Sequence, residues 1–115
     1  MIESILDFEH IIEEIHIEKL IEDNDTHAFK ARLILKNQSI LIIKDYRFID
    51  GSRKYSFHWM YEIGKLIIRW DNEPHWKNID TFPHHKHIDK NENVYASFEI
   101  TLPLILKQIE TIIVP

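Results

Sequence analysis

Residues 27–71 alternate between apolar and polar side chains with a period of two, and this pattern constrains the fold more than any other feature of the chain. In the first run, every second residue is apolar (Phe29, Ala31, Leu33 and Leu35). The pairs Asn37-Gln38, Asp50-Gly51 and Ile63-Gly64 then separate three further runs, at roughly 39–49, 53–62 and 65–71. A period of two is typical of half-buried strands, and turn residues at this spacing indicate successive hairpins. The pattern predicts an antiparallel meander.

The two ends of the chain have the spacing of helices. Apolar residues three and four positions apart predict an amphipathic helix over residues 2–15, followed by a brief strand over 17–22. Residues 72–93 have neither period and are rich in Pro, His, Asn and Asp, which predicts an irregular loop. After Thr101, which can cap a helix, apolar residues again follow helical spacing.

These segments predict an α+β fold with one domain spanning residues 1–115. The expected order is an N-terminal helix, a four- to five-stranded antiparallel meander sheet, a long His-rich loop and a C-terminal helix. Both helices should pack on one face of the sheet. The 115 residues suffice for one hydrophobic core.

Composition excludes several classes of protein. The chain has no Cys, which rules out a disulfide framework and a thiolate zinc site. No apolar run approaches the roughly 20 residues of a membrane helix, and the N-terminus is acidic where a signal peptide would be basic. We therefore expect a cytoplasmic protein with no membrane partner.

Charge is segregated along the chain although its formal net value is −5. Residues 1–26 contain nine acidic residues and one Lys, whereas residues 27–87 contain eleven basic residues, six acidic residues and six of the eight His. A basic central segment favours a polyanionic partner such as RNA.

Pairing arithmetic predicts where that basic charge lies. If each hairpin has a two-residue turn, His58 faces Arg69, Ser56 faces Asp71 and Lys30 faces Asp45. The cationic or imidazole side chains on this outer face would be Lys30, Arg32, Arg47, Lys54, His58 and Arg69. Asp45 and Asp71 would share the face, and Lys44 would point inward. An ordinary solvated sheet face is also polar, but the excess of cations favours a polyanion.

Residues 69–87 concentrate groups that carry chemistry. Arg69, Asp71, His75 and Trp76 fall within eight positions, and His84, His85 and His87 fall within four. Imidazoles suit metal ligation or proton transfer, and they also form ordinary hydrogen bonds to loop carbonyls. If a divalent metal is bound, the predicted ligands are Asp71, His75, His85 and His87, although no motif such as HExxH is present.

RNA cleavage without a metal requires a base for the 2′-OH, an acid for the leaving oxygen and a cation for the phosphate. His58 with one of His84, His85 or His87 could be base and acid, Arg69 could hold the phosphate, and Asp71 could orient an imidazole. Trp76 is the aromatic residue expected to stack on a base, because Tyr55 and Trp59 should point into the core. Lys86 would add a further cation to the RNA-binding set.

Three ordered blocks of the chain resemble the TumE-like toxins of bacterial and archaeal toxin–antitoxin pairs. They are Tyr55-Ser56-Phe57-His58-Trp59, residues 64–75 including Arg69-Trp70-Asp71, and Thr81-Phe82-Pro83-His84-His85-Lys86-His87. The likeness covers nearly the whole chain. It implies a toxin that halts growth when unopposed, and a cognate antitoxin protein encoded nearby, which we expect to cover the basic face. The family pattern often has a second His where this chain has Trp76.

The leading hypothesis from the sequence is a type II toxin that acts on RNA as a metal-independent endoribonuclease. The alternatives are a non-enzymatic module that binds RNA or protein through the basic face, and a metal-dependent nuclease or hydrolase built on the His loop. The sequence leaves open whether the chain is catalytic, whether it uses a divalent metal and whether it forms homo-oligomers.

Overall fold

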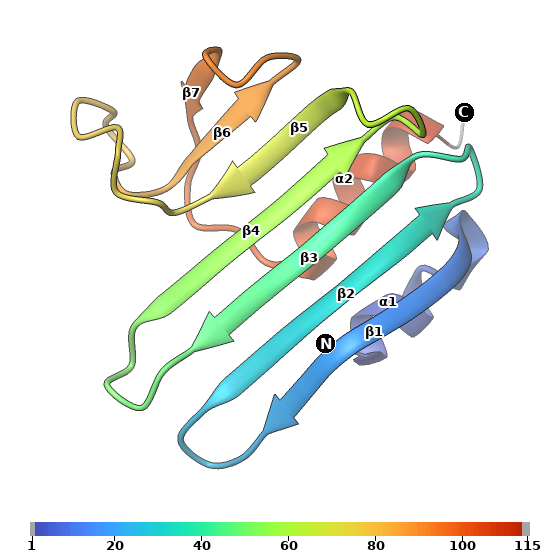
Figure 1. The fold of residues 1–115 in the computed structure, drawn as a ribbon, viewed down its shortest axis with the longest axis horizontal. Coiled ribbons are helices and arrows are strands. Elements are labelled where there is room, and N and C mark those ends of the chain that lie inside the picture. Colours follow the sequence, from blue (N-terminus) through green and yellow to red (C-terminus); the bar gives the residue numbers. More distant parts are fainter. Residues whose placement is uncertain (1, 114–115) are drawn as a thin grey trace.

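The computed structural model describes residues 2–113, which form one antiparallel sheet of seven strands and two α-helices (Figure 1). Each strand pairs with its neighbours in the chain. The strands are β1 (Ile12–Glu22), β2 (His27–Leu35), β3 (Ile40–Arg47), β4 (Arg53–Met60), β5 (Leu66–Asp71), β6 (His85–Ile88) and β7 (Val94–Ala96). The helices are α1 (Ile2–Asp7) and α2 (Leu102–Ile113), and a short 3-10 helix, η1 (Glu9–Ile11), follows α1.

The predicted α+β class and the antiparallel meander are confirmed, but the sheet has seven strands and the prediction was four or five. The first difference lies at the N-terminus, where the predicted helix over 2–15 ends at Asp7. Residues from Ile12 onward pair with β2 as an 11-residue strand. Its β-branched Ile residues suit a strand, and ladder hydrogen bonds to β2 outweigh the helical spacing.

The second difference lies in the segment 72–93, where an irregular loop was predicted. Residues 72–84 are indeed turns and bends, but β6 follows, pairs with β5 and is itself paired with β7. Strand β6 has only four residues, and the two side chains that it buries are His85 and His87. Because buried imidazoles replace the usual apolar residues, the alternation of β6 does not register as a hydrophobic period.

The three hairpins that join β2 to β5 all have three-residue loops. In each loop one residue has a positive φ: Gln38 at 74°, Gly51 at 86° and Gly64 at 92°. In each hairpin a backbone hydrogen bond joins the two residues that flank the loop. In the second hairpin, for example, the amide of Phe48 donates to the carbonyl oxygen of Ser52 at 2.9 Å. This is the type I turn followed by a left-handed residue, and it shifts the register by one position from the two-residue turn that was assumed.

The shift reverses the orientation of β3 alone. Lys30 pairs with Lys44 and not with Asp45, and Arg47 pairs with Arg53 and not with Lys54. The second slip returns β4 to its predicted orientation, since two slips of one residue cancel. The prediction was therefore wrong for β3: Lys44 lies on the outer face, whereas Asp45 and Arg47 lie on the face that carries the helices.

Strand β5 keeps the predicted register, with His58 opposite Arg69 and Ser56 opposite Asp71. The third loop also has three residues, but an irregularity between Trp59 and Met60 restores the pairing. A β-bulge adds one residue to one strand, which compensates for the extra loop residue.

The hydrophobic core lies between the sheet and the two helices, which both cover the same face (Figure 1). The inner face of the sheet contributes Phe29, Leu33, Leu41, Phe57, Trp59 and Trp70, all at most 2% exposed. Helix α2 contributes Leu102, Ile105, Leu106 and Ile109. The helical spacing of the apolar residues after Thr101 also predicts Ile112 on this inner side, but Ile112 is 61% exposed. No helix within residues 2–113 has the length and apolar character needed to cross a membrane.

A buried ion pair sits at the edge of this core. Arg53 donates from Nε and Nη2 to the two carboxylate oxygens of Asp45, at 2.9 and 3.0 Å. Its Nη1 donates to Glu99 and to the carbonyl of Ile100, so each of the three guanidinium nitrogens has an acceptor. The guanidinium also lies over the Tyr55 ring at 4.1 Å. Burial opposes the charged form, but Asp45 and Glu99 outweigh it and raise the pKa of Arg53.

We expect Asp45→Asn to lower the free energy of unfolding by roughly 3–5 kcal/mol, because it leaves a buried guanidinium without its main counter-charge. Urea denaturation followed by circular dichroism measures the decrease. The matched control is Asp89→Asn, which removes the exposed ion pair with Lys65 and should cost less than about 1 kcal/mol. Equal decreases in the two variants would contradict the role given to the buried pair.

Candidate functional site

A groove with a volume of about 840 Å³ runs across the sheet face opposite the helices. Strands β1 to β6 and the segment after β5 all contribute to it. The residues that line it are Lys19, Lys30, Lys44, Tyr46, Phe48, Lys54, Ser56, His58, Arg69, Asp71, Glu73, His75, Trp76, His85, His87 and Asn91. We call this surface the cationic groove, because five Lys or Arg side chains in it face only two carboxylates.

The cations of the groove differ in whether they are paired. Lys30 lies 3.2 Å from Glu18, Lys54 lies 3.3 Å from Glu73, and Arg69 lies 3.1 Å from Asp71. Lys19 and Lys44 are exposed and have no carboxylate partner among the residues that the structure describes. Lys19 instead lies 5.9 Å from the centre of the Tyr46 ring. The groove therefore carries unbalanced positive charge in an acidic protein.

Most of the residues predicted from the sequence meet in the cationic groove. They are Lys30, Lys54, His58, Arg69, Asp71, His75, Trp76, His85 and His87. Four other predicted residues do not line it, namely Arg32, Arg47, His84 and Lys86.

For each of these four residues, the local structure explains why its side chain does not line the groove. Arg32 shares the face of Lys30 but lies opposite Ile42, beyond the groove lining. Arg47 follows the reversed β3 onto the other face. Lys86 alternates with His85 and His87 and therefore points away from them. His84 precedes β6, and its Nδ1 lies 2.8 Å from the hydroxyl of the core residue Tyr55.

Seven residues that line the groove were not among the predicted site residues, and three of them show the structural reason. Lys44 was assigned to the inner face by the register error described above. Lys19 lies in the part of β1 that was predicted as a brief strand over 17–22, but no pairing partner was assigned to that strand. Asn91 lies in the turn between β6 and β7, and knowledge of that hairpin is needed to place it beside His87.

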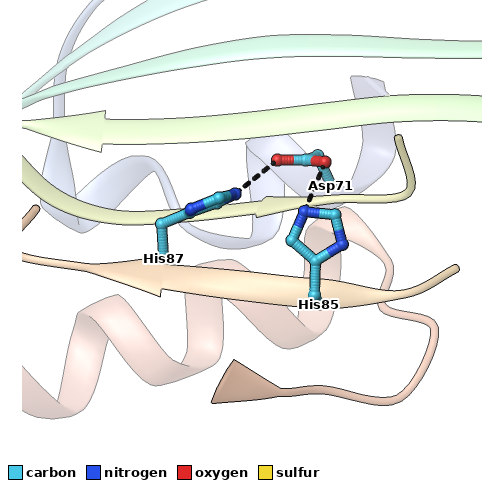
Figure 2. A group of neighbouring side chains, drawn as sticks. All are labelled: Asp71, His85 and His87. Carbon is cyan, nitrogen blue, oxygen red and sulfur yellow. Dashed lines mark ion pairs between the residues drawn. The ribbon is translucent and has the colours of Figure 1, made fainter. Parts of the chain in front are cut away.

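Asp71, His85 and His87 form a buried cluster at one end of the groove, which we call the Asp–His–His centre (Figure 2). Nε2 of His85 lies 2.9 Å from Oδ1 of Asp71, and Nε2 of His87 lies 3.4 Å from Oδ2. All three residues are at most 4% exposed. The cluster forms because β5 pairs with β6, with Asp71 opposite His85 and Arg69 opposite His87.

The other ring nitrogen of each histidine is held by a backbone carbonyl. Nδ1 of His85 lies 2.9 Å from the carbonyl oxygen of Pro83, and Nδ1 of His87 lies 2.7 Å from that of Asn91. A carbonyl oxygen can only accept, so each Nδ1 must carry the proton and donate. In a neutral imidazole the remaining nitrogen then has a lone pair. When the two imidazoles are neutral, both Nε2 atoms therefore carry lone pairs close to the Asp71 carboxylate.

The Asp71 carboxylate is held in place by two donors of its own. Nε of Arg69 donates to Oδ2 at 3.1 Å, and the backbone amide of Glu73 donates to Oδ1 at 3.0 Å. Nη2 of Arg69 also donates to the side chain of Asn91, which links the guanidinium to the loop that holds His87. These contacts fix an anionic carboxylate in one orientation.

Trp76 lies against the Asp–His–His centre. The indole meets the rings of His85 and His87 edge-on, with centroids 6.5 and 6.1 Å apart. The segment that carries Trp76 is anchored by Asn72, whose side chain accepts from the amide of Tyr55 and donates to the carbonyl of Arg53. Asn72 thus continues the ladder between β4 and β5 and places the following loop over the groove.

His58 faces the groove from β4, opposite Arg69. Burial lowers the pKa of His58, and the positive charges of Arg69 and Lys44, together with that of His87 whenever its ring is protonated, lower it further. The pKa of His87 is also lowered, first by burial, although its hydrogen bond to Asn91 opposes the change. A lowered pKa keeps an imidazole neutral near neutral pH, which is the form that accepts a proton.

Chemically, the groove combines cations of the kind that suit phosphate, an imidazole whose pKa is lowered and a set of side chains that could ligate a metal. The ligand atoms of Asp71, His85 and His87 all lie within 4.8 Å of one another. These three could hold a metal ion, whereas His75, the fourth predicted ligand, is exposed and lies 3.9 Å from Glu73.

We expect Lys44→Met to raise the pKa of His58 toward the ordinary value of 6.5, because the substitution removes one of the positive charges that disfavour the imidazolium. NMR titration of the His58 ring protons measures the shift. Lys65→Met, which changes a lysine outside the groove, should leave the titration unchanged. An unchanged pKa in the Lys44 variant would contradict the electrostatic coupling across β3 and β4.

Comparison with known proteins supplies the family. The family model described as "Toxin TumE" matches residues 2–113, which is nearly the whole chain. Neither the curated proteins nor the solved structures contain a significant match. The resemblance of the three sequence blocks is thereby confirmed, and a toxin of this kind implies a cognate antitoxin partner. The chain belongs to the TumE toxin family and is a toxin of a toxin–antitoxin system.

Proposed function

We propose that this type II toxin acts on RNA as an endoribonuclease and that the cationic groove binds and cleaves the strand. The observation that supports this most is the meeting of five cations and the imidazole of His58, whose pKa is lowered, in one groove. Phosphate groups are the natural ligands of such a surface, because RNA carries one negative charge per nucleotide.

Two features favour RNA as the ligand, and the first of them favours a single strand over a duplex. Tyr46, Phe48 and Trp76 line the groove among the lysines, Phe48 exposed and the other two partly exposed, and accessible aromatic rings stack on unpaired bases. Lys19 and Lys44 are exposed without carboxylate partners in the described part of the chain, so their binding to phosphate would break no ion pair. Trp76 thus keeps the base-stacking role predicted from the sequence, and Tyr46 and Phe48 join it.

The proposed reaction is transesterification within the RNA. The ribose 2′ oxygen attacks the adjacent phosphorus, the new O2′–P bond forms and the P–O5′ bond breaks. His58 accepts the proton from the 2′-OH, and Arg69 stabilises the charge of the phosphorane. The products are a 2′,3′-cyclic phosphate and a 5′-OH, whose oxygen takes up one proton.

His75 is the histidine best suited to supply that second proton. His84 contacts Tyr55 away from the groove, and both ring nitrogens of His85 and His87 already face a carbonyl or Asp71. His75 lines the groove and its side chain is 73% exposed, which leaves it free to approach the leaving oxygen. These steps require no metal, as in the mechanism predicted from the sequence, but His75 takes the place of the predicted His84, His85 or His87 as the acid. They leave the Asp–His–His centre without an assigned role.

For binding, we expect the double variant Lys19→Met/Lys44→Met to weaken single-stranded RNA binding and to flatten its salt dependence. Removing one lysine–phosphate interaction should reduce the slope of log K against log salt by about 0.7. Fluorescence anisotropy at several salt concentrations measures the slope. The control is Lys36→Met/Lys65→Met, two lysines outside the groove that are paired with Glu13 and Asp89. Equal slopes in both double variants would place the RNA elsewhere.

For cleavage, we expect His58→Ala to slow cleavage of end-labelled RNA by roughly 10²- to 10⁴-fold, which is the usual contribution of a general base. His10→Ala, which alters a histidine beside Glu110 on the helix side, should cleave at the unaltered rate. Gel analysis should find cyclic phosphate ends. If His58→Ala cleaves as fast as the unaltered protein, the assigned base is wrong.

Binding alone is the second candidate function, and the unpaired lysines favour it equally. Growth arrest separates the two. If the toxin only binds RNA, the double lysine variant relieves growth arrest in cells and His58→Ala does not. If it cleaves RNA, both variants relieve the arrest.

A further inference from the structure

The Asp–His–His centre has an electrostatic conflict when its two histidines are neutral. Two imidazole Nε2 atoms lie near the two oxygens of one carboxylate, at 2.9 and 3.4 Å. All of these atoms are acceptors when the histidines are neutral. Acceptors this close in a buried site repel one another unless a positive charge lies between them.

One of these atoms, Nε2 of His85, also lacks a hydrogen-bond partner. The approach of His85 to Asp71 lacks the alignment of a hydrogen bond. Nε2 of His85 is the one buried side-chain nitrogen or oxygen, among residues 2–113, that has no hydrogen-bond partner. A buried polar atom without a partner is costly, and native proteins contain few of them. Here that atom lies 2.9 Å from a carboxylate oxygen inside a cluster of potential ligands (Figure 2).

We propose that Asp71, His85 and His87 bind one divalent transition-metal ion, of which zinc is the best fit. Two imidazole nitrogens and one carboxylate oxygen form a borderline ligand set that suits zinc and its first-row neighbours better than magnesium or calcium. Three protein ligands leave a coordination position open, as in sites that bind water or substrate.

The surroundings of the three ligands have the form that metal sites require. Each ligating histidine donates its Nδ1 proton to a backbone carbonyl, which fixes the ring and directs Nε2 at the ion. Arg69 and the amide of Glu73 hold the carboxylate in the same way. These supporting groups come from Pro83, Asn91 and the end of β5 with the residues that follow it, so separate parts of the fold aim three ligands at one point.

The distances between the three ligand atoms determine how far the side chains must move together when a metal ion binds. Ligands about 2.0–2.1 Å from zinc in a tetrahedron lie roughly 3.4 Å from one another. The three ligand atoms here lie within 4.8 Å, so metal binding draws the side chains together by at most about 1.4 Å. Trp76 covers the imidazoles by edge contacts and is the neighbour that would adjust.

The existence of the metal site is independent of the proposed RNA cleavage, but its use there rests on that proposal. The ion would lie beside His58 and Arg69 at the end of the groove, where it could bind a phosphate oxygen as a Lewis acid. A protein that binds zinc but neither binds nor cleaves RNA would overturn the proposed function and leave the metal site standing.

The test is isothermal titration calorimetry on the metal-free full chain, produced without a polyhistidine tag. The chain is titrated with zinc and, separately, with magnesium. We expect one zinc per chain, no binding of magnesium at millimolar concentration, and at least a 100-fold decrease of zinc affinity in His85→Gln and in His87→Gln. His10→Gln and His16→Gln change exposed histidines and should bind zinc as the unaltered chain does. Absence of zinc binding by the folded chain at 100 µM would overturn the proposal, and so would an equal decrease in the control variants.

Because a buried histidine variant can unfold, a second measurement uses the unaltered chain. Nitrogen-15 NMR of the imidazoles at pH 7.5 should show, on addition of zinc, two rings that keep a proton on Nδ1 and shift at Nε2. If both Nε2 atoms carry protons and do not respond to zinc, the positive charge between the ligands is supplied by imidazolium, and the metal site is refuted.

Discussion

Strand register is the constraint on which both faces of this protein depend. Since side chains alternate along a strand, a slip of one residue exchanges the core face and the outer face of that strand. Three loops, each with one left-handed residue, and one irregularity in the pairing of β4 with β5 set the register from β2 to β5. The same alternation sends Trp59 and Trp70 into the core and sends His58 and Arg69 into the groove. Packing and site chemistry are therefore decided by the same backbone geometry.

Two buried carboxylates show how differently this fold treats charge. Asp45 lies against the guanidinium of Arg53, which offers two aligned donors and also reaches Glu99 and Ile100. Asp71 also has donors, from Arg69 and Glu73, but its remaining sides face two imidazole nitrogens. In the first arrangement the protein itself supplies the opposite charge and the hydrogen-bond partners, so the pair stabilises the fold. The second is complete only when a cation or protons lie between the ligands, which is typical of functional sites.

The negative net charge of the chain does not reveal that one face of the sheet carries an excess of positive charge. Acidic residues are concentrated before residue 27, and several of them lie on β1 beside the basic strands. Glu18 on β1 neutralises Lys30, whereas Lys44 in the middle of the sheet is too far from that strand to be paired in the same way. A protein with a formal charge of −5 thus presents a cationic groove. In a toxin, such a groove is also the natural surface for an inhibitor to cover, because masking charge is a direct way to block phosphate binding.

The sequence by itself determined the α+β class, the antiparallel meander, the core residues of β2 and β4, and most members of the site. These follow from side-chain period and residue type, which are local properties. Tertiary structure decided the rest. Only pairing with β2 makes residues from Ile12 onward a strand, and only pairing with β5 makes His85 and His87 buried partners of Asp71. Loop length decided that Lys44 joins the groove and that Asp45 leaves it, because register depends on hydrogen bonds between strands, which no local pattern of side chains encodes.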